Sequence, residues 1–92
     1  MYPMMISFAK QLNKLLMPHR ILIVEDEDII RNSLREFLAD EGYQVAVANS
    51  VVNGMIQAKR QDFDVAICDV QLPDGDGLDL LRRLQQLNPT IS

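Results

Sequence analysis

The sequence predicts an α/β fold, a doubly wound parallel sheet with helices on its faces. Three short apolar runs predict its strands, at residues 21–24, 43–48 and 65–68. Amphipathic patterns with helical spacing follow each run, at residues 28–40, 51–60 and 78–87. Alternating strands and helices are typical of parallel sheets with right-handed crossovers. The 92 residues leave room for one small domain.

The first strand and helix are predicted from a change of apolar period. Residues 21–24 are β-branched and aliphatic, which is typical of a strand buried on both faces, and the run ends at two acids. A helix of about 13 residues begins at Asp28 and is followed by Gly42, a typical C-terminal cap. Its apolar stripe consists of Ile30, Leu34, Phe37 and Leu38.

The second strand alternates between two kinds of side chain. Val45 and Val47 point to one face, and the small Ala46 and Ala48 point to the other. Asn49 or Ser50 is expected to cap the next helix. That helix has low local propensity at Asn53 and Gly54, and its stripe consists of Val52, Met55, Ile56 and Lys59.

The third strand again ends at an acid, Asp69. Residues 70–77 contain Pro73, Gly75 and Gly77 and are predicted to form a loop. The third helix has a leucine stripe and ends before Asn88, because a proline follows. Residues 90–92 are expected to begin a fourth strand.

Composition excludes several classes of function. The net charge of −4 offers little attraction to phosphate backbones, so we expect no direct nucleic-acid binding by this segment. No apolar window approaches the roughly 20 residues of a membrane span. Cys68 is the single cysteine and lies in an apolar run, as expected of a small buried residue in a reducing, cytoplasmic compartment.

Residues 1–19 are interpreted as an N-terminal extension and residues 20–92 as the domain. Residues 1–16 are weakly amphipathic with two lysines, and could lie on a membrane or a partner as a short basic helix. The favoured interpretation is an upstream extension, with Met17 as a natural start. His19 is then a solvated entry to the first strand and no metal ligand.

Three carboxylates are predicted to meet at one edge of the sheet. Glu25 and Asp26 follow the first strand and Asp69 follows the third, and ligands bind beyond the carboxyl ends of such strands. Mg²⁺ would offset their mutual repulsion. A carboxylate can form an aspartyl phosphate. Asp69 is the expected nucleophile, because it alone closes a buried strand and opens a loop in which the flexible Gly75 and Gly77 let backbone groups approach phosphate and metal closely. The alternative is that the three acids are solvated strand ends or helix caps.

Residues 20–92 resemble response-regulator receiver domains. The resemblance lies in residues 21–27, a strand with an acidic pair, and in residues 69–78, which resemble the phosphorylation loop. It implies a flavodoxin-like receiver fold with strand order 2-1-3, incomplete beyond the start of a fourth strand. It also implies a phosphorelay protein of a two-component system, which is no enzyme and receives a phosphoryl group from a sensor histidine kinase or a phosphotransfer protein.

By the same resemblance each acidic position has a role. Asp69 is the phospho-acceptor and also a Mg²⁺ ligand. Asp26 is a direct Mg²⁺ ligand, Glu25 a ligand through water, and Gln71 a ligand through its backbone carbonyl. A haloacid-dehalogenase-type phosphatase would need an aspartate at the position of Gln71. A calcium loop would need a glycine at the position of Asp79. Three further acids are interpreted as turn residues and helix N-terminal charges: Asp74, Asp76 and Asp79.

Two residues of the receiver pattern have no counterpart. Thr90 and Ser92 lie too early to be the switch hydroxyl, and no lysine follows Lys59. We therefore expect a fragment of a longer regulator, whose third strand forms an exposed edge open to receiver-receiver association. The alternative function is a non-switching interaction module that docks on a kinase or another receiver through Ile30, Leu34 and Phe37.

Overall fold

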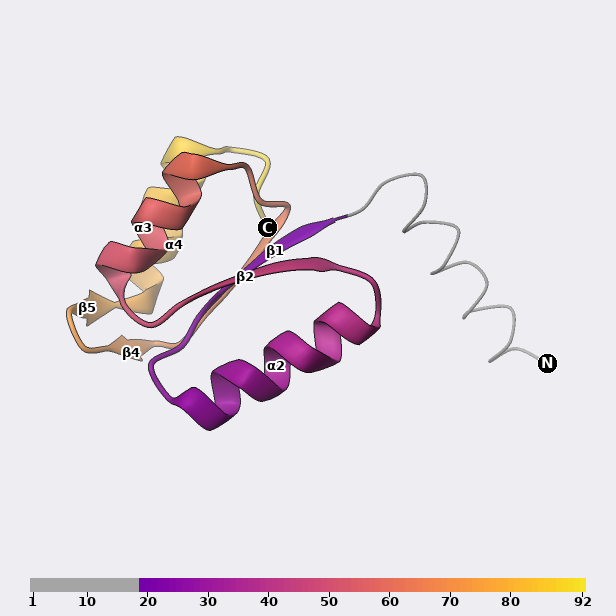
Figure 1. Ribbon diagram of the computed structural model, residues 1–92. Helices are drawn as coiled ribbons and strands as arrows, with labels where there is room; N and C mark the ends of the chain where they lie inside the picture. The colour runs from indigo at the N-terminus through magenta and orange to yellow at the C-terminus, as the bar shows by residue number, and fades with distance from the viewer. Residues whose placement is uncertain (1–18) are drawn as a thin grey trace.

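A computed structural model of the chain describes residues 19–92. Three parallel strands form the sheet in the order β2-β1-β3 (Figure 1). The strands are β1 (Arg20–Val24), β2 (Gln44–Ala48) and β3 (Val65–Cys68). The helices are α2 (Asp28–Asp40), α3 (Val51–Arg60) and α4 (Gly77–Leu87). Of the predicted extension over 1–19, residues 1–18, which include the predicted start at Met17, lie outside the described residues.

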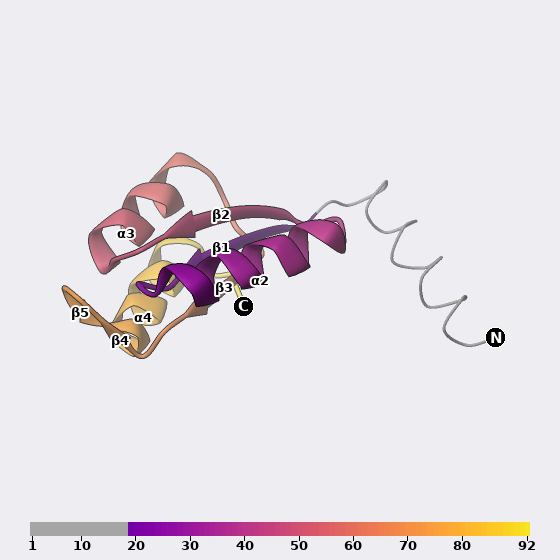
Figure 2. The same ribbon diagram turned by 60° about the horizontal axis from the view of Figure 1, so that its bottom comes forward.

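The sheet is the middle of three layers. Helix α2 covers one face, and α3 and α4 lie together on the other (Figures 1 and 2). Leu22 and Val24 of β1 point toward α3 and α4, and Leu80 and Leu84 of α4 complete this fully buried core. Because side chains alternate along a strand, Ile23 points to the α2 face, where it is also fully buried. The predicted doubly wound sheet with order 2-1-3 is confirmed.

Most predicted boundaries agree with the structure to within one residue. Gly42 ends α2 with a φ of 97°, the left-handed conformation that glycine adopts most readily. Its N–H donates to the carbonyl of Ala39 at 2.9 Å. Ser50, one of two predicted caps, accepts a hydrogen bond from the N–H of Asn53 at 3.1 Å and begins α3.

The loop predicted over 70–77 contains a small hairpin instead. Strands β4 (Gln71–Leu72) and β5 (Gly75–Asp76) pair antiparallel, with Leu72 opposite Gly75. Leu72 is 9% exposed and joins the core. Proline and glycine predicted a turn correctly, but two-residue strands held by one buried leucine are too short to produce an apolar period.

Of the expected fourth strand, the structure contains only the first hydrogen bonds to β3. Ser92 donates its N–H to the carbonyl of Asp64 at 2.9 Å and accepts from the N–H of Ala66 at 3.0 Å. These two bonds have the spacing of a parallel ladder beside β3. Ile91 is buried in the core, whereas Ile67 on β3 is 38% exposed.

The structure bears on two of the expectations drawn from composition. None of the helices within residues 19–92 is long and apolar enough to cross a membrane. Cys68 is partly buried, and burial raises the pKa of its thiol to about 11. The thiol is therefore protonated at neutral pH and a poor nucleophile, which agrees with a packing role.

Asp74 fastens the hairpin to helix α3. Its carboxylate accepts hydrogen bonds from the N–H groups of Val51 at 2.7 Å and Val52 at 3.0 Å. The sequence predicted turn residues and helix N-terminal charges among these acids. Asp74 is both, because it lies in the turn of the hairpin and its carboxylate binds the first N–H groups of α3. Asp76 fulfils the predicted role, because it caps α4 by accepting from the N–H of Leu78. The two bonds to α3 lower the pKa of Asp74 below its usual value.

Replacing Asp74 with alanine is expected to lower the melting temperature at pH 7. The native pKa is depressed, so this stabilisation is present above the ordinary aspartate pKa and is lost as the pH falls through the native value. The difference in melting temperature between wild type and Asp74→Ala should therefore become smaller below about pH 4. Thermal melts followed by circular dichroism at several pH values measure this difference. The control is Asp62→Ala, because Asp62 is exposed. A gap that does not change with pH would contradict the role of the charge.

Candidate functional site

Backbone hydrogen bonds of the sheet place the acids. Glu25 directly follows β1, and its N–H donates to the carbonyl of Ala48 at the end of β2, at 3.0 Å. Asp69 directly follows β3, and its N–H donates to the carbonyl of Val24 at 2.9 Å. The last residues of three parallel strands are therefore in register, and the acids that follow them share one edge of the sheet.

The predicted convergence of Glu25, Asp26 and Asp69 is found in the structure. One carboxylate oxygen from each residue lies within 4.8 Å of the other two. At that separation and an effective dielectric near 20, each charged pair repels by about 3 kcal/mol. Unlike strand-end acids that point apart into water, these three form a single cluster of negative charge.

Few protein groups compensate this charge. The N–H of Glu27 donates to the carboxylate of Glu25 at 3.1 Å, and the N–H of Gln71 donates to Asp69 at 3.4 Å, a long bond. The adjoining hollow, of about 640 Å³, is lined by residues around the acids: Asp26, Glu27, Asp69, Val70, Gln71, Leu72 and Pro73. Asp26 and Asp69 thus face an open space that admits water and a small ligand.

The surroundings of Glu25 raise the pKa of its carboxyl. Burial raises the pKa of its carboxyl above the usual glutamate value, and the charge of Asp69 adds to the rise. The N–H of Glu27 works in the opposite direction but does not cancel the two. The surroundings of Glu25 therefore disfavour its charged form relative to an isolated glutamate, as expected where acids are drawn together.

Replacing Glu25 with glutamine is expected to raise the melting temperature of the metal-free protein at pH 7, because one repelling charge disappears. A raised pKa in the folded state means that the ionised form of Glu25 opposes folding. As the pH falls through that pKa, the melting temperature of wild type should therefore approach that of Glu25→Gln. Melts from pH 4 to 8 in the presence of a chelator measure this. A lower melting temperature for Glu25→Gln at pH 7 would contradict it.

The donor set suits a hard divalent cation. Mg²⁺ prefers oxygen ligands, takes one or two carboxylates and keeps its other positions for water and phosphate oxygens. Asp26 and Asp69 offer carboxylate oxygens at an open hollow, and Gln71 lines the same hollow. Glu25 is within reach of an ion held there, directly or through water. The clustered oxygens therefore fit the predicted ion.

Gly77 brings the start of α4 against the backbone of Asp69. A Cβ atom built on Gly77 would lie 1.8 Å from the carbonyl oxygen of Asp69 and 3.3 Å from the Cα of Val70. The N–H of Gly77 donates to the carbonyl of Val70 at 2.8 Å. The sequence predicted that Gly77 lets backbone groups come close. Here the groups in contact are the start of α4 and the backbone of Asp69, at a distance that no side chain allows.

The two late hydroxyls lie far from the acids, as predicted. Ser92 pairs beside Asp64, at the start of β3, and the acids follow the ends of the strands. Thr90 donates its hydroxyl to the side chain of Asn88 at 2.8 Å. Neither hydroxyl therefore lies beside the acidic cluster.

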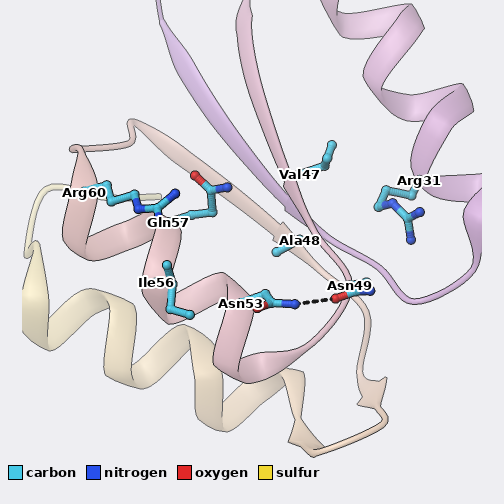
Figure 3. Close-up of a pocket in the computed structure, with 8 residues that line it drawn as sticks. All are labelled: Arg31, Val47, Ala48, Asn49, Asn53, Ile56, Gln57 and Arg60. Atoms are coloured by element: carbon cyan, nitrogen blue, oxygen red, sulfur yellow. Dashed lines mark hydrogen bonds between the residues drawn. The ribbon is translucent and has the colours of Figure 1, made fainter.

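A second hollow lies beside β2 and contains none of the three acids. It measures about 430 Å³ and is lined from α2, β2 and α3 by Arg31, Val47, Ala48, Asn49, Asn53, Ile56, Gln57 and Arg60 (Figure 3). Asn53 donates to Asn49 across its mouth at 2.7 Å. Arg31 donates to the backbone carbonyl of Glu25 at 3.0 Å and pairs with Asp28. This arginine therefore braces the acidic loop, a role with no signal in the helical pattern.

Comparison with known proteins gives a consistent match. The family model of the response regulator receiver domain matches residues 21–92. The KDP operon transcriptional regulatory protein KdpE of Escherichia coli (strain K12) is 42% identical over 66 residues, which are 72% of this chain and 29% of KdpE. The alginate biosynthesis transcriptional regulatory protein AlgB of Pseudomonas putida is 42% identical over 72% of this chain and 15% of its own length. The chain thus spans less than a third of these relatives.

Solved structures show the same likeness. A CheY-like response regulator receiver domain protein from Methanospirillum hungatei JF-1 is 35% identical with a TM-score of 0.79, over 82% of this chain and 60% of that one. The non-phosphorylated HemR receiver domain from Leptospira biflexa is 31% identical with a TM-score of 0.73, over 80% of this chain and 59% of that one. The flavodoxin-like arrangement predicted from the sequence is confirmed.

Proposed function

The chain belongs to the response regulator receiver domain family, and from this premise we propose that it accepts a phosphoryl group on Asp69 in a Mg²⁺-dependent reaction. One observation carries the proposal: oxygens of Glu25, Asp26 and Asp69, which are far apart in sequence, lie within 4.8 Å of one another at the strand ends. Such a cluster is costly unless a cation offsets its negative charge.

The chemistry follows from the positions of the side chains. A carboxylate oxygen of Asp69 attacks phosphorus, the bond from phosphorus to the donor's leaving group breaks, and an aspartyl phosphate forms while the leaving group takes the electron pair. Mg²⁺, when bound, would neutralise charge on the acids and on the phosphoryl oxygens. Asp26, Asp69 and the backbone carbonyl of Gln71 would hold it directly, and Glu25 through water.

The family membership suggests the protein's partners. We propose a sensor histidine kinase or a phosphotransfer protein as donor, a cytoplasmic location, and the role of a phospho-acceptor and not of an enzyme. Residues 20–92 form the proposed receiver unit and residues 1–19 its extension. The relatives KdpE and AlgB are named transcriptional regulatory proteins, but the net charge of −4 gives this segment no basis for binding DNA itself.

Phosphorylation of the full chain by a small phosphodonor tests the proposal. Incubation with acetyl phosphate and Mg²⁺ should add one phosphoryl group, detected by intact mass under acidic conditions. A chelator should prevent the addition, and restored Mg²⁺ should recover it. Absence of the adduct with Mg²⁺ present, in protein shown by circular dichroism to be folded, would overturn the proposal.

A second candidate function is a non-switching module that binds a kinase or another receiver. Its support is the exposure of two large apolar side chains on α2, Ile30 at 43% and Phe37 at 63%. Leu34 lies between them and is partly buried. Binding to a kinase that is unchanged by Asp69→Ala, without any aspartyl phosphate, would favour this function over the first.

A further inference from the structure

Arg31 ties the start of α2 to the loop that carries two of the acids. One terminal nitrogen of its guanidinium donates to the backbone carbonyl of Glu25 at 3.0 Å, and the other pairs with the carboxylate of Asp28. Its backbone N–H donates to the carbonyl of Glu27 at 2.9 Å. The side chain of Arg31 is only 15% exposed, whereas that of Asp28 is 80% exposed. The guanidinium is therefore packed against the loop and not free in solvent.

The carbonyl that Arg31 holds belongs to the peptide bond between Glu25 and Asp26. A peptide group is planar, so a fixed oxygen also fixes the N–H and the Cα atom of Asp26. The other side of Glu25 is held as well, because its N–H donates to the carbonyl of Ala48 at the end of β2. The two bonds together set the course of the backbone from β1 to Asp26.

We propose that Arg31 is a positioning residue, which sets the affinity of the acidic cluster for Mg²⁺ through the peptide group before Asp26. The inference rests on the proposed function, in which Asp26 is a direct ligand of the ion. Carboxylate oxygens of Glu25, Asp26 and Asp69 lie within 4.8 Å of one another, and an ion needs them to stay there although their charges repel. Replacing a group that holds a metal ligand in place typically weakens metal binding by about 10–100-fold.

Arg31 also contributes to the start of α2, and this contribution is separable from the proposed one. The side chain of Glu27, the N-cap residue, makes no capping hydrogen bond, so loss of Arg31 would loosen the first turn of the helix. A residue that only stabilises the helix lowers the melting temperature and leaves the Mg²⁺ affinity of the folded protein unchanged. The affinity is therefore the quantity that tests the proposal.

The charge of Arg31 predicts an effect of opposite sign. A guanidinium beside a cation site repels the cation, so Arg31→Ala would bind Mg²⁺ more tightly if charge alone mattered. Positioning through the carbonyl of Glu25 predicts weaker binding. The direction of the change in affinity thus separates the two effects.

Calorimetric titration of the full chain with Mg²⁺ measures this affinity. The dissociation constant of Arg31→Ala should be about tenfold higher than that of wild type or more. The matched control is Arg35→Ala, which removes the same charge one turn further along α2. Arg35 makes none of the hydrogen bonds described for the acidic loop, so this variant should bind Mg²⁺ as wild type does. Phosphorylation of Arg31→Ala by acetyl phosphate should return to the wild-type level at saturating Mg²⁺, because Asp69 is unchanged.

Each outcome bears on the proposal. Weaker Mg²⁺ binding by Arg31→Ala, with wild-type affinity in Arg35→Ala, supports it. Unchanged or tighter binding by folded Arg31→Ala, or equal weakening in both variants, overturns it while the proposed function stands, because wild type still binds Mg²⁺ and is phosphorylated. Absence of binding and of phosphorylation in wild type would overturn the proposed function and this inference with it.

Arg31→Lys decides the question if Arg31→Ala does not fold. Lysine keeps the charge but lacks the planar fork that reaches the carbonyl of Glu25 and the carboxylate of Asp28 at once. Weaker Mg²⁺ binding by folded Arg31→Lys would support the proposal, since the charge is retained. Wild-type affinity in this variant would overturn it.

Discussion

Replacing Asp69 with asparagine is expected to abolish phosphoryl transfer to the chain. The asparagine amide has nearly the same shape and follows β3 in the same way, but it lacks the anionic oxygen that attacks phosphorus. Glu25 and Asp26 remain beside it, yet both follow β1, and neither opens the loop that lines the hollow as Asp69 does. Incubation with acetyl phosphate and Mg²⁺, read by intact mass, should show no adduct.

The control for this loss is an acid at the other end of the sheet. Asp62 is exposed and precedes β3, so Asp62→Asn removes one negative charge without touching the cluster. It should be phosphorylated like wild type. Asp69→Asn should also melt at a slightly higher temperature than wild type without metal, because the cluster loses one of its charges. A phosphoryl adduct on folded Asp69→Asn would refute Asp69 as the acceptor.

The acidic cluster was predictable because the sequence pattern indicates both where the strands end and that they form a parallel sheet. Apolar runs ended directly at Glu25 and at Asp69, and a parallel sheet brings the carboxyl ends of its strands to one edge. The backbone bonds from Glu25 to Ala48 and from Asp69 to Val24 are the direct consequence of that register. The Mg²⁺ ligand through Gln71 remains a prediction, supported by its position at the hollow.

The contacts that hold the site together were not predictable in the same way. Asp74 binds the start of α3, some 22 residues earlier in the chain, and Arg31 reaches back to the carbonyl of Glu25. Both bonds depend on how helices pack in three dimensions, and neither leaves a period in the sequence. Composition predicted a turn at Pro73 and Gly75, but it carried no information about which helix the turn would touch.

Gly77→Ala is expected to be the most damaging small substitution in this domain. The added Cβ would lie 1.8 Å from the carbonyl oxygen of Asp69, a backbone atom that cannot turn aside. Either α4 must shift or the chain at Asp69 must move. Overpacking of this kind costs about 3 kcal/mol, the upper part of its usual range, in a domain whose total stability is of order 5–15 kcal/mol. Urea unfolding measures the loss.

Gly75→Ala is the matched control, two residues away in strand β5 of the hairpin. There the added Cβ would meet the side chain of Val51 at 3.1 Å, and a methyl group can give way by a few tenths of an ångström. Its cost should be about 1 kcal/mol or less. If Gly77→Ala is too unstable for equilibrium unfolding, its soluble yield and phosphorylation should still fall below those of Gly75→Ala. Equal stability of the two variants would mean that α4 can move away from Asp69 at little cost, and that Gly77 does not position the acceptor.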